Sequence, residues 1–391
     1  MSVRALYVHV PFCASRCAYC DFESSAPAPC DRERLMGEYL EEVFARIDLL
    51  ARAGSLEGVE TVYVGGGTPS LLGEGLVELV GRIRSVCSPL EFSCEANPES
   101  FTAELARRLV RAGLTRVSLG VQTLDAVELK TIGRVHTAAR ALDALEAAAA
   151  AGLDVSCDLM CGLPGQTLAS FERSLSGVLS CPVGHVSVYP LSIEEGTALD
   201  RMIERGLVEE PDEDLQADCM ELAAARLREA GFERYEVASY ARSGRACRHN
   251  IAYWTGTSYV GVGRAAASML SADDLLACAA LFPAVSVPTR GRVRIVQLDD
   301  SAHDFDFEVL SESEALAEDL MLACRMSAGI PRTLLNRART LFGASRVDGQ
   351  MAFLEGEGLL KKGVSGGLAP TERGWLMGNE LFGAMWDLHC S

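Results

Sequence analysis

The segment VETVYVGGGTPSLLGEGLVELVGRIRSV, residues 59–86, contains one complete unit of strand, loop and helix. Residues 59–64 form an apolar run of strand length, and residues 71–86 have a helical pattern. The glycine-rich sequence GGGTP, residues 65–69, lies between them. A strand joined to a helix in this way is the repeating unit of parallel β/α proteins, so the segment predicts a fold built from such units.

The same alternation recurs on both sides of this unit, from residue 4 to about residue 190. The predicted strands are 5–10, 59–64, 90–94, 116–119, 155–160 and 186–189. The predicted helices between them are 32–53, 71–86, 102–112, 138–151 and 168–179. Six repeats predict an α/β fold, either an open doubly wound sheet or a β/α barrel. Both architectures place functional groups at the carboxyl ends of the strands.

The rest of the chain is less regular. A helix is predicted at 212–230, residues 244–268 are rich in glycine and aromatic residues, and residues 270–304 have weak patterning. Helices at 314–323, 331–342 and 346–355, a hairpin at 358–371 and a last helix capped by Thr371 predict a winged-helix-like domain. We therefore expect two domains, residues 1–300 and 301–391. The segment from residue 312 carries 8 basic and 10 acidic residues, which favours a packing or dimerisation module over a DNA-binding one.

The composition limits the possible function classes. The 391 residues are 49% hydrophobic and 23% charged, and the net charge is −18, which argues against a general nucleic-acid binder. No signal peptide is apparent, and the longest apolar stretch, residues 275–287, is too short to span a membrane and contains Pro283. We therefore expect a cytoplasmic protein whose 14 cysteines are reduced.

Three cysteines follow the first predicted strand in the spacing C-x3-C-x2-C, as Cys13, Cys17 and Cys20. A zinc site would need a fourth ligand such as His9 or Cys30, and a disulfide would leave one cysteine over. An iron–sulfur cluster with three thiolate ligands would leave one iron open. An open coordination position is typical of catalytic rather than structural metal sites, and we favour this interpretation.

Polar groups at the other strand ends suit a small chelating ligand. The glycines at 65–67 let main-chain atoms approach a ligand closely, and Glu95 and Gln122 end or follow later strands. Arg134 offers a guanidinium for a carboxylate, and Asp158 offers an acceptor for hydroxyls or amines. Together these groups suit a zwitterionic amino acid that carries a nucleoside.

The motifs CASRCAYC, GGGTPS, CEANPES, SLGVQ, GRVH and DLMCGLPGQT, in this order, resemble the radical S-adenosylmethionine (SAM) superfamily. Within it, the chain is similar to the coproporphyrinogen dehydrogenase-like group over almost its whole length. The resemblance implies a partial β/α (TIM-like) barrel, a [4Fe–4S] cluster on the three cysteines and SAM on the open iron. It implies a first SAM site at Tyr7, Gly66, Gly67, Thr68 and Glu95, and positions for a second molecule at Tyr19, Gln122, Arg134 and Asp158.

Two members of this group differ in features that the sequence shows. Oxygen-independent coproporphyrinogen III dehydrogenases, which decarboxylate porphyrinogen propionates oxidatively, carry a fourth cysteine where this chain has Phe22, and a longer N-terminal extension. Heme chaperones of the HemW type have CDF at this point and a later H-N-x-x-Y-W motif, and residues 249–254 read HNIAYW. The resemblance therefore implies heme binding and delivery to an acceptor protein, with the dehydrogenase as the alternative.

The HNIAYW motif suggests the heme site. We expect His249 to be an accessible imidazole that contacts heme iron or holds the heme in place, and Tyr253 and Trp254 to pack against the macrocycle. The alternative is a buried structural histidine beside two core aromatics. A homodimer is a further expectation.

Overall fold

The computed structural model describes residues 3–279, 281–282, 291–299, 304–363 and 366–390. The strands are β1 Ala5–Val10, β2 Thr61–Gly66, β3 Glu91–Ala96, β4 Arg116–Gln122, β5 Asp154–Cys161, β6 His185–Pro190, β7 Glu233–Arg234, β8 Ser239–Ala241, β9 Tyr259–Val262, β10 Ala267–Ser271, β11 Arg292–Gln297, β12 Phe305–Leu310, β13 Leu360–Lys362 and β14 Leu368–Pro370. The α-helices are α1 Pro29–Arg52, α2 Glu74–Val86, α3 Ala103–Ala112, α4 Ala126–Thr131, α5 Ala138–Ala151, α6 Leu168–Leu179, α7 Ala198–Glu204, α8 Glu213–Glu229, α9 Arg248–Trp254, α10 Ala272–Ala277, α11 Glu312–Ala323, α12 Arg332–Phe342, α13 Ala344–Gly356, α14 Glu372–Leu376 and α15 Gly378–Trp386.

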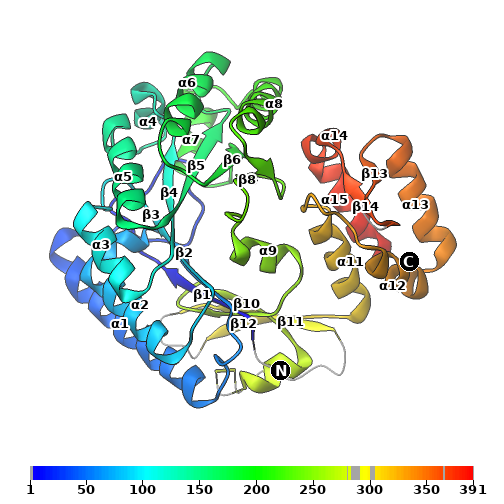
Figure 1. Cartoon of the computed structure of the whole chain (residues 1–391), viewed down its shortest axis with the longest axis horizontal. Helices are drawn as coiled ribbons and strands as arrows, with labels where there is room; N and C mark the ends of the chain where they lie inside the picture. Colours follow the sequence, from blue (N-terminus) through cyan, green and yellow to red (C-terminus); the bar gives the residue numbers. More distant parts are fainter. Residues whose placement is uncertain (1–2, 280, 283–290, 300–303, 364–365, 391) are drawn as a thin grey trace.

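The six predicted strand–helix repeats are confirmed. Strands β1 to β6 are parallel and lie side by side in chain order, with crossover helices between them. The sheet curves, with α1 to α6 on its outer side and α9 on its inner side (Figure 1). This is the partial β/α barrel with a helical C-terminal domain that the sequence and the resemblance predicted.

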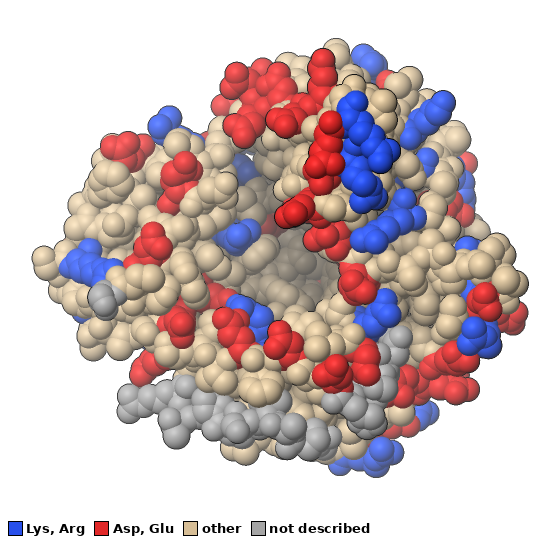
Figure 2. All heavy atoms as spheres, turned by 180° about the vertical axis from the view of Figure 1, so that it is seen from behind, with Lys and Arg blue, Asp and Glu red and all other residues tan. Residues whose placement is uncertain are grey.

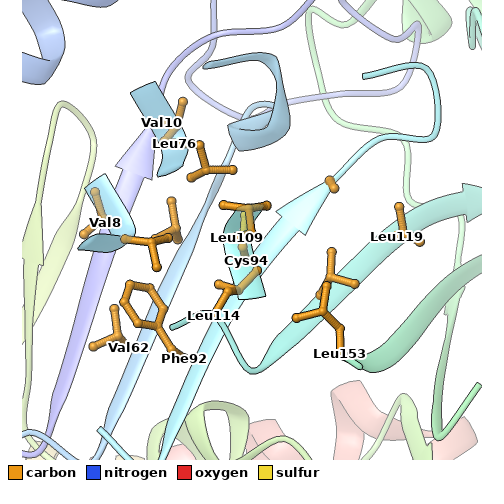
Figure 3. Close-up of a cluster of buried hydrophobic side chains, with 14 of the residues drawn as sticks. Val8, Val10, Val62, Leu76, Phe92, Cys94, Leu109, Leu114, Leu119 and Leu153 are labelled. Carbon is orange, nitrogen blue, oxygen red and sulfur yellow. The ribbon is translucent and has the colours of Figure 1, made fainter. Parts of the chain in front are cut away.

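The two faces of the strands have different chemistry. On β1 to β3 the apolar residues Val8, Val62 and Phe92 pack outward with Leu76 and Leu109 of the covering helices (Figure 3). The residues between them on each strand face the inside of the barrel, and many of these are polar. This period of two follows from the pleat of a strand, and it places the polar groups in one interior space.

Beyond β6 the sheet continues at both edges, and the sequence did not predict this. Strand β9 pairs in parallel with β1, and β10, β11 and β12 extend the sheet in antiparallel order to twelve strands, with β8 and β7 at the other edge. Strand β12 lies at an edge and buries only Leu310, so it lacks the clear alternation of a half-buried strand. The part of the apolar stretch 275–287 beyond Phe282 lies outside the described residues.

The C-terminal unit has a core of its own, formed by residues of α11, α12, α13 and α15 and of the β13–β14 hairpin. The Thr371 side chain accepts a hydrogen bond from the Gly374 N–H and caps a helix as predicted, but the expected single last helix is divided into α14 and α15. The boundary predicted at residue 301 precedes β12, which pairs with β11 along its whole length. We therefore propose that the C-terminal domain begins with α11, at Glu312.

The surface carries both signs of charge. On the face shown in Figure 2, Asp and Glu side chains are interspersed with Lys and Arg around a central hollow. Within the described part of the chain, no helix is both long enough and apolar enough to cross a membrane.

Candidate functional site

The three cysteines lie in the loop that follows β1, and this loop is held in place by main-chain hydrogen bonds. Cys13 N donates to Ser25 O at 2.8 Å, and Ala18 N donates to Ile132 O at 2.9 Å. All three cysteines line one cavity of about 320 Å³ inside the barrel. In the described residues, no three His, Cys, Asp or Glu side chains converge on a position for a single ion. A cubane cluster does not require such convergence, because each cysteine binds a different iron.

The glycine-rich loop after β2 passes so close to the cysteine loop that side chains would not fit. A Cβ atom on Gly67 would lie 2.6 Å from the carbonyl oxygen of Phe12. Gly66 has φ +108°, a conformation that residues with a Cβ rarely adopt. The main chain of these glycines therefore lines the cavity directly beside the cysteines.

Glu95, near the end of β3, has no cationic partner among the described residues. Its Oε1 accepts from Tyr63 Oη at 2.8 Å, and its Oε2 accepts from Gly66 N at 3.0 Å. Burial in the barrel raises the pKa of Glu95 to about 7, and the nearby Asp158 adds to the rise. When it is ionised, this buried carboxylate is suited to bind the ammonium group of a ligand.

Arg134 also lines the cavity, and its guanidinium is held by several hydrogen bonds. Its Nη1 donates to Cys17 Sγ at 3.5 Å, and its Nη2 donates to Asn97 Oδ1 at 2.7 Å and to the carbonyl oxygen of Gly120. Its Nε is buried and has no hydrogen-bond partner among the described residues. A cationic group with a free buried donor is suited to a carboxylate.

Gln122 and Asp158 are two further polar residues that line the cavity. Gln122 has φ +66°, which is uncommon for a residue with a side chain and coincides with an irregularity in the pairing of β4 with β5. Such strain is concentrated at functional sites. Asp158 Oδ2 accepts from Ser118 Oγ at 2.9 Å, and burial raises the pKa of the Asp158 carboxyl.

The structure thus brings most of the sequence-predicted residues together. Those that line the same cavity are Cys13, Cys17, Cys20, Tyr19, Gly66, Gly67, Thr68, Glu95, Gln122, Arg134 and Asp158. Tyr7 does not line the cavity, but it stacks on Tyr63, with 6.4 Å between the ring centroids, and its hydroxyl lies 3.0 Å from His9 Nδ1. Phe22, at the position of the absent fourth cysteine, also lines the cavity.

The cavity includes residues that the sequence analysis missed. Ser93 and Arg116 lie deeper in the barrel, and Ser93 Oγ and Arg116 Nη2 are both buried with no partner within the described ranges. Asn97 and Asn250 line the cavity as well. The available signal was the alternation of the strands, because Ser93 lies two residues before Glu95 and therefore faces the same side.

The expectation of an accessible His249 is wrong. His249 lies on α9 and is only 2% exposed. Its Nδ1 hydrogen-bonds with Thr61 Oγ1 at 3.0 Å, and its ring stacks on Tyr63 with centroids 5.1 Å apart. His249 is therefore buried in the core, as the alternative interpretation of the HNIAYW motif expected. The helix is held there because the buried Glu91 carboxylate accepts hydrogen bonds from the main-chain N–H groups of Arg248 and His249, at 3.0 Å each.

The two aromatic residues of the HNIAYW motif lie in different surroundings. The Tyr253 ring packs on His249 and on Tyr259, with centroids 5.0 and 4.2 Å apart. Trp254 lies under the guanidinium of Arg325, 5.0 Å from the ring centroid, so it contacts the C-terminal domain. None of the three predicted heme contacts lines the cavity.

Comparisons with known proteins agree with this arrangement. The Radical SAM superfamily matches residues 7–176. The chain is 38% identical over 348 residues to the heme chaperone HemW of Mycobacterium tuberculosis (strain H37Rv), which covers 85% of this chain and 84% of that protein. It is 31% identical over 393 residues to the heme chaperone HemW of Bacillus subtilis (strain 168), which covers 98% of this chain and 99% of that protein.

Among solved structures, the coproporphyrinogen III oxidase HemN of Escherichia coli superposes with a TM-score of 0.77. The match covers 98% of this chain and 90% of that one, at 19% sequence identity, and so shows a shared fold. The predicted resemblance is therefore confirmed. With the three cysteines, the glycine loop and Glu95 around one cavity, and with identity to these chaperones along most of its length, the chain belongs to the HemW family of the radical SAM superfamily.

Proposed function

We propose that this protein is a heme chaperone that carries a [4Fe–4S] cluster and SAM and delivers heme to an acceptor protein. The observation that carries the proposal is the identity to curated heme chaperones over 85% to 98% of the chain. The net charge of −18 argues against nucleic acid as a partner, because phosphate backbones are bound by basic surfaces. A cytoplasmic location, a homodimer and the domain division stay predictions.

The residues around the cavity fit the two cofactors. The cluster would be held by Cys13, Cys17 and Cys20, and the ammonium of SAM would lie against Glu95. Arg134 Nε is a donor for a carboxylate, and the closely approaching glycines leave main-chain atoms free for the ligand. When bound, the reduced cluster with SAM supplies one-electron radical chemistry. The protein orients the ligand and keeps water away from it. Binding of a second SAM at Tyr19, Gln122, Arg134 and Asp158 stays a prediction.

The dehydrogenase alternative is tested directly by turnover. We expect no conversion of coproporphyrinogen III to protoporphyrinogen IX by anaerobically reconstituted protein with SAM and a competent reductant. The reason is that Phe22 replaces the fourth cysteine of that enzyme. Product would be measured by chromatography after oxidation to the porphyrin. Multiple turnovers would identify the chain as an enzyme of porphyrin synthesis.

The predicted heme ligand His249 is buried in this fold. His249 Nδ1 is hydrogen-bonded to Thr61, and its Nε2 is buried and has no partner in the part of the chain that the structure describes. Burial lowers the pKa of His249 to about 3, so the imidazole is neutral at physiological pH, the form that binds iron. An imidazole oriented through one nitrogen and free at the other is the arrangement found in metal-ligating histidines. We propose that heme reaches it when α9 shifts relative to the barrel.

The His249→Ala variant is expected to bind heme at least about tenfold more weakly, equivalent to about 1.4 kcal/mol. Heme affinity would be measured by absorbance titration, and the cluster spectrum should be unchanged because the cysteines lie at the opposite ends of the strands. The matched control is His185→Ala. His185 is also buried in the barrel, but both its nitrogens have partners, Ser156 Oγ at 2.6 Å and Tyr235 Oη at 2.9 Å.

Both substitutions remove a buried side chain and should lower stability, so thermal midpoints must be compared. Equal loss of heme affinity in the two variants would indicate a structural effect. Unchanged affinity in a folded His249→Ala protein would exclude His249 as the ligand.

A further inference from the structure

The geometry points to Asn97 as a positioning residue that directs hydrogen bonds to two of the three cysteine sulfurs that would hold the cluster. These hydrogen bonds raise the reduction potential of the cluster. The inference rests on the proposed [4Fe–4S] site and goes beyond it, because Asn97 belongs to neither the cysteine motif nor the glycine loop. Asn97 follows β3 and lies between two residues that each contact a different cysteine. These residues are Thr68, after β2, and Arg134, in the connection after α4.

One side of the Asn97 carboxamide acts through Thr68. Asn97 Nδ2 donates to Thr68 Oγ1 at 2.9 Å, and Thr68 Oγ1 lies 3.5 Å from Cys13 Sγ. A hydroxyl has one proton. Because Asn97 approaches Thr68 as a donor, the Thr68 proton is left for the Cys13 sulfur.

The other side acts through Arg134. Asn97 Oδ1 accepts from Arg134 Nη2 at 2.7 Å, and Arg134 Nη1 lies 3.5 Å from Cys17 Sγ. A guanidinium only donates, so the oxygen of the carboxamide must face it, and the NH₂ group must face Thr68. The orientation of the amide is therefore determined by its neighbours. Only a side chain that donates and accepts at once can hold both contacts.

The position of Asn97 is itself fixed by the fold. Its main-chain N–H donates to Ser70 Oγ at 3.2 Å, and Ser70 Oγ is paired with Ser100 Oγ at 2.6 Å. Asn97 thus connects the ends of β2 and β3 with the cysteine loop. Hydrogen bonds to the sulfurs are one of the factors that set the potential of an iron–sulfur cluster, because they stabilise the added electron. Loss of a donor should therefore lower the potential.

Asn97→Asp is the informative substitution, because it keeps the shape and the contact with Arg134 but removes the donor. The Thr68 proton is then expected to turn toward the new carboxylate, and Cys13 loses its hydrogen bond. Thr68→Val removes the same donor without adding charge, and Thr68→Ser restores it. The midpoint potential of the reconstituted cluster would be measured by redox titration followed by EPR.

We expect Asn97→Asp and Thr68→Val each to lower the potential, Thr68→Ser to stay near the native value, and Asn97→Asp to have a smaller effect in the Thr68→Val background. A remote control is Asn336→Asp in the C-terminal domain. Asn336 Oδ1 likewise accepts from an arginine, Arg339, at 3.0 Å, and its replacement should leave the potential unchanged.

The outcomes separate this inference from the proposed function. If native protein takes up no cluster, the proposed function fails. Two results with a fully formed cluster would overturn the inference. One is an Asn97→Asp variant with an unchanged potential. The other is an Asn97→Asp shift of equal size in the native and the Thr68→Val backgrounds, because Asn97 would then not act through Thr68. If Asn97→Asp loads incompletely, Asn97→Ala, which adds no charge, should still lower the potential, and an unchanged value there would also overturn it.

Discussion

Replacing Cys17 with alanine is expected to abolish the iron–sulfur cluster. Native protein reconstituted without oxygen should bind about four irons per chain, as a [4Fe–4S] cluster requires, and the Cys17→Ala variant should retain almost none. The effect is large because the site has three thiolates, and the loss of one leaves two irons without a protein ligand. In the fold, Cys17 Sγ also accepts a hydrogen bond from Arg134 Nη1 at 3.5 Å, and the alanine variant loses this contact as well.

Iron, acid-labile sulfide and the visible absorbance of the cluster measure this outcome. Cys30→Ala and Cys87→Ala are the matched controls, since Cys30 is exposed at the start of α1 and Cys87 is buried beside α2, away from the cavity. Both should keep the full iron content. A complete cluster in Cys17→Ala, or stoichiometric zinc in the native protein, would contradict the assignment.

Replacing Glu95 with glutamine is expected to weaken SAM binding by about a hundredfold or more. Removing one partner of a buried charge pair costs about 3–5 kcal/mol, because the remaining charge stays desolvated. The ammonium of SAM would be that remaining charge. Binding would be measured by equilibrium dialysis on the reconstituted protein, with Glu38→Gln, on the exposed face of α1, as the control.

The pKa of Glu95 adds a pH dependence with a definite sign. Only the ionised carboxylate attracts an ammonium group, and its pKa is raised to about 7. SAM affinity should therefore be full above pH 7 and fall about tenfold per unit at lower pH, and Glu95→Gln should remove this dependence. Asp158, Tyr63 and Tyr7, on β5, β2 and β1, interact with Glu95, and no cation in the described residues pairs with it. Native affinity that does not change from pH 8 to pH 6 would contradict the assigned role.

The same raised pKa affects the stability of the ligand-free protein in the opposite direction. Between about pH 4.5 and 7, folded protein binds the Glu95 proton more tightly than unfolded protein does. The resulting contribution to stability is present below this window and is lost as the pH rises through it. SAM should therefore raise the thermal midpoint more at pH 8 than at pH 6.

Local patterns in the sequence determined the architecture of the barrel. The strand runs and helix periods of β1 to β6 are set by which residues must be buried, and burial has a period that a single sequence displays. The spacing of Cys13, Cys17 and Cys20 predicted the cluster, and the polar residues at the strand ends predicted the rest of the cavity. They converge because parallel strands bring their carboxyl ends to the same edge of the sheet.

Only the tertiary structure decided the remaining features, because they depend on contacts between segments far apart in the chain. Strands β9 to β12 take their positions from pairing with β1 and with one another, which their weak alternation does not reveal. His249 is buried because Glu91, more than 150 residues earlier, caps α9 inside the barrel. Asn97 differs from other asparagines only in that folding places Thr68 on one side of it and Arg134 on the other. Hydrogen-bond partners of this kind carry no periodic signal, so they become visible only when the strands are assembled.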